Sequence, residues 1–238
     1  MNLVSEWTFD EGGAEDTWGN NDGTLGDGVT STTYPTLITG DNCISGSCMS
    51  FDGGDYITVA SNGLNKFSVQ SFTISEWFKP NIIQNYILLW SYDYTSHISP
   101  YYAQELRVDQ TGQLWFGWNN GTSAKAITTS DKMISANNWY HVAVAYTSGK
   151  QKMYINGKEI SSGVATDAIS YYSQPVWIGK SNFGITQSTT IDDVRFYDAV
   201  LTTAQIKQEY IAGLNSLLAN NNISKEEYDQ RLNNLAQK

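Results

Sequence analysis

The chain has 238 residues, a net charge of -10 and a sequence pI of about 4.5. That length suits a single large β-sandwich, which buries most of the apolar surface that its unfolded form exposes. The acidic balance, with no Lys/Arg cluster and no apolar run of about 18 residues, predicts no nucleic-acid partner and no direct membrane insertion of this fragment.

Short runs of β-branched and aromatic residues, bounded by Gly, Asn, Asp and Ser, recur through most of the chain. These runs predict strands at 3–9, 48–52, 55–59, 71–79, 86–92, 104–109, 113–118, 123–128, 138–147, 151–156, 158–162, 175–180 and 189–198. The pair Asn156-Gly157 predicts a tight hairpin, because both residues tolerate positive φ. Many strands with Gly-rich connections indicate an all-β, two-sheet antiparallel jelly-roll sandwich.

Helical signals appear only near the C-terminus. Two capping boxes begin the predicted helices, one at Thr202 and one at Ser224. The second segment carries a narrow apolar stripe at helical spacing, formed by Tyr228, Leu232 and Leu235. We therefore predict a β body over 1–213 and a short C-terminal helical appendage over 214–238, whose stripe docks on a partner.

The chain resembles laminin-G-like, concanavalin A-like lectin/glucanase domains over residues 3–210. The matching segments, in the expected order, are VSEWTFDEGG (4–13), GSCMSFDGGDYITV (46–59), FTISEWFKP (72–80), WYHVAVAYTSGKQKMYINGKEI (139–160), IGKSNFG (178–184) and IDDVRFYDAVLTTAQI (191–206). The resemblance implies a sandwich of two curved antiparallel sheets. It implies function less narrowly, because the same body serves lectins, adhesion modules, glycosidase accessory domains and some glycosidases. The segment 214–238 resembles helical tails that follow such domains in bacterial pilin-like surface proteins.

Catalytic patterns are missing from the sequence. Retaining glycosidases need two carboxylates about 5–5.5 Å apart, and no Glu-x-Asp-x-Glu pattern occurs on a predicted strand. Asp192 and Asp193 are adjacent and point to opposite faces of their strand. Of the two histidines, His141 shows no orienting carboxylate, and we expect it to be buried and hydrogen-bonded to a neighbouring strand or loop. The chain is therefore predicted not to be an enzyme.

The closing strand places a carboxylate at the edge of the core. Strand alternation predicts that Asp192, Val194 and Phe196 share one face. An unpaired carboxylate at that position is costly, so Asp192 needs a cation or several N–H donors.

Calcium is the cation that the family resemblance implies. Related domains hold calcium between the N-terminal loop, here residues 10–24, and the closing strand. The resemblance assigns that role to Asp16 and Asp192, with Asn21 and Asp22 as helpers and backbone oxygens completing six to eight ligands. The alternative is a hydrogen-bonded Asx turn without metal, because Asp, Asn and Gly also dominate ordinary turns.

An aromatic segment at 88–108 is the candidate ligand-binding loop. Sugars bind flat aromatic side chains through their C–H faces, with a few polar groups fixing orientation. We expect Trp90 and Trp115 to lie in the core. The residues predicted to meet a ligand are Tyr94, His97, Tyr101, Tyr102 and Trp118.

Cys43 and Cys48 are the two cysteines of the chain. Zinc would need two more Cys or His ligands, and a Cys-x-x-Cys redox motif is absent. A loop disulfide remains, and it favours export to an oxidising compartment.

These observations predict a non-catalytic extracellular or cell-surface module that binds carbohydrate or a cell-surface protein and is stabilised by calcium. One alternative is a glycoside hydrolase or polysaccharide lyase on the same fold. Another is a structural subunit or spacer of a pilin-like surface assembly, with an anchor upstream of Met1.

Overall fold

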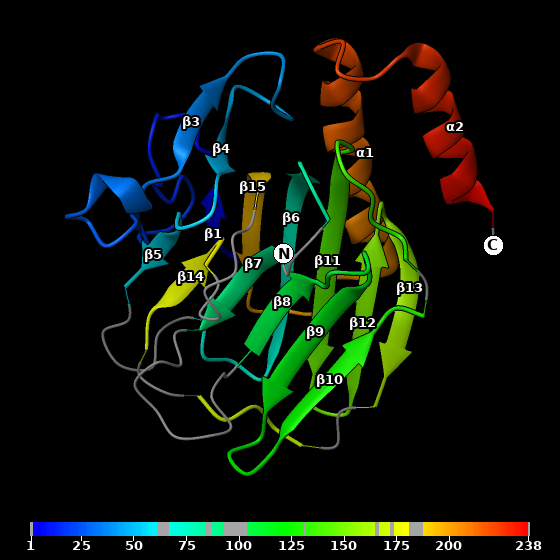
Figure 1. Cartoon of the computed structure of the whole chain (residues 1–238). Helices are drawn as coiled ribbons and strands as arrows, with labels where there is room; N and C mark the ends of the chain where they lie inside the picture. Colours follow the sequence, from blue (N-terminus) through cyan, green and yellow to red (C-terminus); the bar gives the residue numbers. More distant parts are fainter. Residues whose placement is uncertain are drawn as a thin grey trace.

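The computed structural model describes residues 2–60, 67–83, 87–92, 104–130, 132–164, 167–171, 174–180 and 188–237. Over these residues the chain forms two antiparallel sheets and two C-terminal α-helices (Figure 1). This is the all-β jelly-roll sandwich with a helical C-terminus that the sequence predicts. No helix in the described ranges is long and apolar enough to cross a membrane.

The larger sheet has eight strands. Along its main path these are β13 (Lys158–Gly163), β12 (Lys150–Ile155), β11 (Tyr140–Thr147), β6 (Ser71–Pro80), β15 (Thr189–Tyr197), β4 (Ser47–Phe51) and β3 (Thr36–Thr39). Strand β1 (Leu3–Trp7) pairs with the second half of β15. The first half of β15 pairs with β4, so β15 holds the N-terminal strand and the cysteine segment in one sheet.

The smaller sheet has seven strands. In spatial order they are β10 (Ala124–Thr128), β9 (Leu114–Asn119), β8 (Gln104–Val108), β7 (Ile87–Tyr92), β14 (Val176–Ile178), β5 (Ile57–Val59) and β2 (Gly23–Leu25). The turn after β12 has the predicted geometry, with φ of 51° at Asn156 and 73° at Gly157. Strands β2 and β3 and the short 3-10 helix at Ser31–Thr33 were not predicted, because they are short and only partly apolar.

The sandwich core lies between the facing sides of the two sheets. Alternate residues of each strand enter it, and aromatic rings fill much of it. Trp90 is completely buried, as predicted, and its ring stacks on Phe196 with centroids 5.5 Å apart. Phe72 stacks on Phe196 from a neighbouring strand, with centroids 5.7 Å apart.

A β-bulge in β15 changes which residues face the core. The pairing of β15 with β6 shifts between Asp192 and Arg195, and Asp193 has a φ of 50°. Val194 and Phe196 lie in the core, whereas Asp192 is paired with the outward-facing Trp77. The prediction that all three residues of the closing strand share a face is therefore wrong, because one extra residue reverses the alternation.

Helix α1 (Thr203–Ala219) covers the outer side of the eight-stranded sheet. It begins at the predicted capping box on Thr202. The helix continues without a break through Gly213, where the predicted boundary of the β body lies. Gly213 faces Trp77, and a Cβ at this position would lie 2.6 Å from the indole. The close packing of helix on sheet explains why this glycine does not end the helix.

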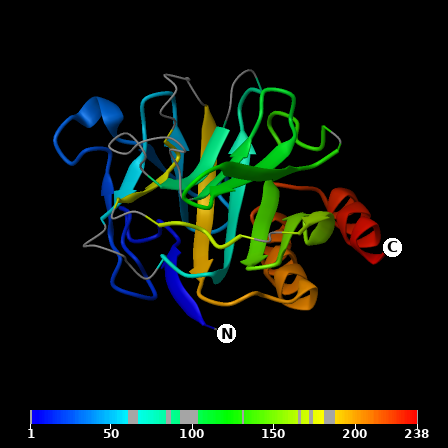
Figure 2. The ribbon, with the colours of Figure 1, turned by 90° about the horizontal axis from the view of Figure 1, so that it is seen from below.

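Helix α2 (Lys225–Ala236) lies beside α1 on the same side of the sandwich (Figure 2). Ser224 caps it by accepting a hydrogen bond from the Glu227 N–H. The predicted apolar stripe packs on the chain's own body, against a cluster that includes Trp77, Trp139 and Tyr210. The stripe, formed by Tyr228, Leu232 and Leu235, is therefore partly buried within the same chain.

Candidate functional site

Most of the predicted ligand-binding residues lie outside the described part of the chain: Tyr94, His97, Tyr101 and Tyr102. The chain leaves β7 at Tyr92 and returns at Gln104, where β8 begins. Both strands belong to the seven-stranded sheet. The described residues on either side of this segment therefore lie on two neighbouring strands of that sheet.

The two tryptophans of β9 have the opposite placement to the one expected. Trp118 is only 3% exposed and stacks on Phe116 in the core, so its ring is not available to a surface ligand. Trp115 points to the outer face and is partly exposed. The alternation of Leu114, Phe116 and Trp118 toward the core is the sequence signal that places Trp115 outside.

A row of directly paired residues crosses the outer face of the seven-stranded sheet. Its members, in order from β5 to β10, are Thr58, Trp177, Ser91, Glu105, Gly117 and Ala126. The row has small side chains except for one indole and one carboxylate. Trp115 lies along the same face, because its ring covers the position that a Cβ on Gly117 would occupy. Glycine at position 117 therefore allows the indole to lie flat on the sheet.

The carboxylate of the row is paired with an arginine. Arg107 Nη1 lies 2.6 Å from Glu105 Oε1, and the guanidinium carbon lies 3.9 Å from the centre of the Trp115 ring. Burial raises the pKa of Glu105 above its ordinary value, and the neighbouring Arg107 opposes that shift. Glu105 Oε2 is buried and accepts no hydrogen bond from the residues that the structure describes. A flat indole and a partly exposed guanidinium therefore lie together on one face, and the completely buried Glu105 carboxylate holds the guanidinium in place.

A second aromatic cluster lies at the other end of the row. Lys180 Nζ is 3.4 Å from the centre of the Trp177 ring and 3.9 Å from the centre of the Tyr56 ring. Cation–π contacts of this kind stabilise the orientation of aromatic rings on a surface. The outer face thus has one tryptophan–cation pair on each side of Glu105.

Glu105 is the single acidic residue in the seven described strands of this sheet. Glycoside hydrolysis requires two carboxyl groups on either side of the scissile bond. The strands of this face supply one, and that one is already paired with Arg107. Their chemistry suits stacking and hydrogen bonding to hydroxyl groups.

The residues predicted to bind calcium near the N-terminus form a hydrogen-bonded loop. Asp16 Oδ1 accepts hydrogen bonds from the backbone N–H groups of Glu6, Trp18 and Gly19, and Oδ2 accepts from Asn21. Burial raises the pKa of Asp16, but these hydrogen bonds outweigh it and the pKa lies below its ordinary value.

The neighbouring carboxylate serves the same loop, because Asp22 Oδ1 accepts a hydrogen bond from the Asp16 N–H. N–H donors thus satisfy the oxygens that a calcium ion would need. The donor set of this loop fits an Asx-type loop better than a metal site.

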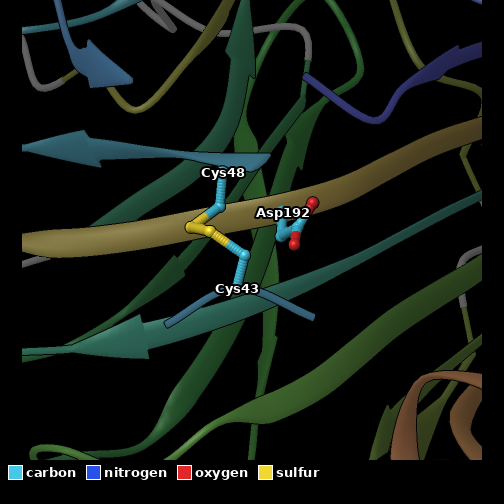
Figure 3. A group of neighbouring side chains, drawn as sticks. All are labelled: Cys43, Cys48 and Asp192. Carbon is cyan, nitrogen blue, oxygen red and sulfur yellow. A yellow bond between two sulfur atoms is a disulfide. The ribbon is translucent and has the colours of Figure 1, made fainter. Parts of the chain in front are cut away.

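Asp192 lies beside the disulfide of Cys43 and Cys48 (Figure 3). Its Oδ2 accepts a hydrogen bond from the Ile44 N–H at 2.8 Å and its Oδ1 accepts from the Asp193 N–H at 2.7 Å. Burial, followed by the charge of Asp193, raises the pKa of Asp192 well above its ordinary value. The carboxylate therefore holds the cysteine loop through backbone N–H groups.

The predicted disulfide between Cys43 and Cys48 is present. These two sulfurs and the Asp192 carboxylate form the one group of three potential metal-ligating side chains in the described ranges. Because the sulfurs are bonded to each other, they offer no thiolate to a metal.

His141 is completely buried beneath α1, as expected, but its ring nitrogens make none of the expected hydrogen bonds to a described strand or loop. Its Nε2 lies 3.6 Å from Glu209 Oε2, so the helix supplies the carboxylate that the strand sequence does not reveal. Burial raises the pKa of Glu209, but His141, Tyr197 and Arg195 outweigh it and keep the pKa below its ordinary value.

Known proteins share this architecture. A family model described as the concanavalin A-like lectin/glucanases superfamily matches residues 51–207. A search of curated protein sequences found no match. Domain 4 of AbnA, an extracellular GH43 arabinanase from Geobacillus stearothermophilus solved with arabinotriose, is 21% identical with a TM-score of 0.69, covering 87% of this chain and 97% of that domain.

Two toxin binding domains are also similar in fold. The binding domain of Paraclostridial Mosquitocidal Protein 1 is 20% identical with a TM-score of 0.67, covering 90% of this chain and 53% of that one. The receptor-binding domain of botulinum neurotoxin mosaic serotype C/D is 17% identical with a TM-score of 0.67, covering 90% and 51%. This chain therefore spans about half the length of each toxin domain. Because the family model matches residues 51–207 and the chain folds into the two sheets of this architecture, the chain belongs to the concanavalin A-like lectin/glucanases superfamily.

Proposed function

We propose that the protein is a non-catalytic, extracellular binding module that recognises carbohydrate on the outer face of its seven-stranded sheet. The observation that carries this proposal is the arrangement of Trp115 and Arg107 on that face, with the buried Glu105 holding the guanidinium. A sugar ring needs an aromatic surface for its C–H groups and a few polar atoms for its hydroxyl groups. The aromatic segment at 93–103 connects the two strands that adjoin this arrangement.

The fold relatives support the same class of function. One of them is a domain of an arabinanase solved with arabinotriose, and two are toxin binding domains. None of the three is named for a catalytic module. The single strand-borne carboxylate of the outer face supports binding over hydrolysis or lyase chemistry.

The disulfide supports an extracellular or cell-surface setting, because such bonds persist in oxidising compartments. Calcium stabilisation by Asp16, Asn21, Asp22 and Asp192 stays a prediction, and the N–H groups that already bond the Asp16 and Asp192 carboxylates stand against it. It is checked by whether EDTA lowers the melting temperature and calcium restores it. The pilin-like assembly remains an alternative, which self-association measured by analytical ultracentrifugation would favour.

The test is a broad array of neutral oligosaccharides, including arabinan fragments, followed by titration of any hit. We expect Trp115→Ala to weaken the affinity for the hit at least tenfold, because the aromatic surface on which the sugar ring would stack is lost. Trp18→Ala is the matched control, since Trp18 is 63% exposed in the N-terminal loop and lies in no strand of either sheet. An array with no hit, or a hit that Trp115→Ala leaves unchanged while Trp18→Ala abolishes it, would overturn the proposal.

A further inference from the structure

A small polar cavity lies between the outer side of the eight-stranded sheet and the C-terminal helix α2. Its volume is about 190 Å³. It is lined by Lys79, Asn137, Asn138, Trp139, Asn222, Ile223, Glu227 and Arg231. The lining comes from β6, from the segment before β11 and from the start of α2, so the cavity exists only when the helical tail is docked.

Lys79 brings an unpaired positive charge to this cavity. Its Nζ lies 5.2 Å from the centre of the Trp139 ring, and no carboxylate in the described ranges lies within 4.0 Å of it. The side chain is partly buried, and burial lowers its pKa. A bound anion would relieve the cost of burying that charge.

The other charged residues of the cavity neutralise each other. Arg231 Nε and Nη2 bond Glu227 Oε1 at 3.0 and 2.7 Å, and Nη1 donates to the Trp139 carbonyl oxygen at 3.0 Å. Ile223 and Glu227 lie on either side of the cap of α2, so the positive end of the helix dipole adjoins the cavity. The net electrostatic preference of the cavity is therefore for an anion.

The asparagines add hydrogen-bonding groups of both kinds. The Asn222 amide donates to the Cys43 carbonyl, and the Asn138 amide donates to the Ala136 carbonyl, which leaves both side-chain carbonyl oxygens as acceptors. Asn137 makes no side-chain hydrogen bond in the described structure and is exposed at the rim. Acceptors beside a cation suit a ligand that carries hydroxyl groups as well as a negative charge.

We infer that this cavity binds the carboxylate end of a hexuronic acid, at the terminus or branch of an acidic saccharide. The volume lies below the roughly 300–1,000 Å³ of ordinary ligand pockets, so it admits one charged group and part of one sugar ring. The carboxylate lies against Lys79, and the ring hydroxyls meet the Asn138 and Asn222 carbonyl oxygens. The choice of a saccharide rests on the proposed carbohydrate-binding function. The cavity itself is on the opposite sheet from Trp115.

The experiment titrates the full chain with free galacturonate and glucuronate by calorimetry, with galactose and inorganic phosphate as comparison ligands. We expect saturable hexuronate binding, weak or no binding of galactose, and weakening by 0.5 M salt. Lys79→Gln should weaken hexuronate binding at least tenfold. Lys150→Gln is the matched control, because Lys150 is exposed and makes no ion pair with any residue in the described ranges. It should bind hexuronate as the parent chain does.

A second measurement on the unaltered chain guards against a folding defect in the variant. Hexuronate should shift the indole N–H resonance of Trp139, which lines the cavity. Equal binding of galactose, or hexuronate binding that Lys79→Gln leaves intact, would overturn the inference. Phosphate binding as tight as hexuronate binding would overturn the saccharide assignment. Neutral oligosaccharide binding through Trp115 is read separately on the array, so either proposal can fail without the other.

Discussion

The indole of Trp77 on β6 stacks on the phenol of Tyr210 on α1, with ring centroids 5.6 Å apart and planes 22° apart. Gly213 lies next along the same side of the helix and lets its backbone approach the indole. The contact joins the central part of the sheet to the first helix. Helix α1 is therefore part of the β body, and the tail that follows it packs on the same cluster.

Gly213→Ala should destabilise the protein by about 1–3 kcal/mol, because the new methyl group meets Trp77 at 2.6 Å. The better helix propensity of alanine, about 1 kcal/mol, acts in the opposite direction. Urea unfolding measures the difference. Trp77→Phe in the same chain should absorb part of the loss, so the double variant should be more stable than the sum of the singles predicts. Additive losses would mean that the helix and the indole are not in contact.

Glu76 predicts a pH-dependent stability. It is completely buried on the core side of β6, neither carboxyl oxygen has a hydrogen-bond partner in the described part of the chain, and burial raises its pKa to about 8. The folded state therefore holds a proton that the unfolded state, with an ordinary pKa of 4.5, releases. The free energy of unfolding should fall as the pH rises from about 4.5 to about 8.

Glu76→Gln removes the titrating carboxyl group. The slope of the free energy of unfolding against pH should therefore flatten between pH 4.5 and about 8. Chemical denaturation at four or five pH values measures it. Glu159→Gln, on exposed β13, is the control and should keep the parent slope. A parent chain whose stability rises steadily over the interval would contradict the buried, protonated state of Glu76.

Replacing both cysteines by alanine should lower the free energy of unfolding by about 2 kcal/mol, because the closed loop is short. Reduction of the parent chain with a phosphine should give a loss of the same size. Mass spectrometry of the native protein verifies that the bond is present. Two free thiols in protein that is purified under non-reducing conditions would exclude it.

Removing residues 224–238 separates two interpretations of the tail. If the apolar stripe packs on the chain's own body, the truncated protein should lose stability and its Trp139 should become more exposed to a quencher. Sedimentation should show no change in oligomeric state. If the tail instead mediates assembly, the truncation should weaken self-association with little loss of melting temperature.

The strands of the sandwich were predictable because their signals are local. Alternation within 113–118 places Leu114 and Phe116 in the core, and the Asn156-Gly157 pair specifies its own turn. The same alternation, followed consistently, also separates Trp115 from Trp118. The bulge at Asp193 was not predictable, since an extra residue at positive φ leaves no periodic trace.

Contacts between distant segments were equally hidden from the sequence. The approach of Glu209 to His141 depends on where α1 docks on the sheet. The unpaired charge of Lys79 depends on the position of α2, which no local pattern determines. Local patterns thus predicted the elements, and only their packing produced the candidate sites.

The cysteine loop is held from three directions. The disulfide closes it, Asp192 accepts its backbone N–H groups, and the side-chain amides of Asn220 and Asn222 donate to the carbonyl oxygens of Ile44 and Cys43. Segments that open together exchange their amide hydrogens together. The loop, the first half of β15 and the link between the two helices should therefore behave as one cooperative unit, so that reduction of a bond near the N-terminus accelerates hydrogen exchange at the C-terminal end of the chain.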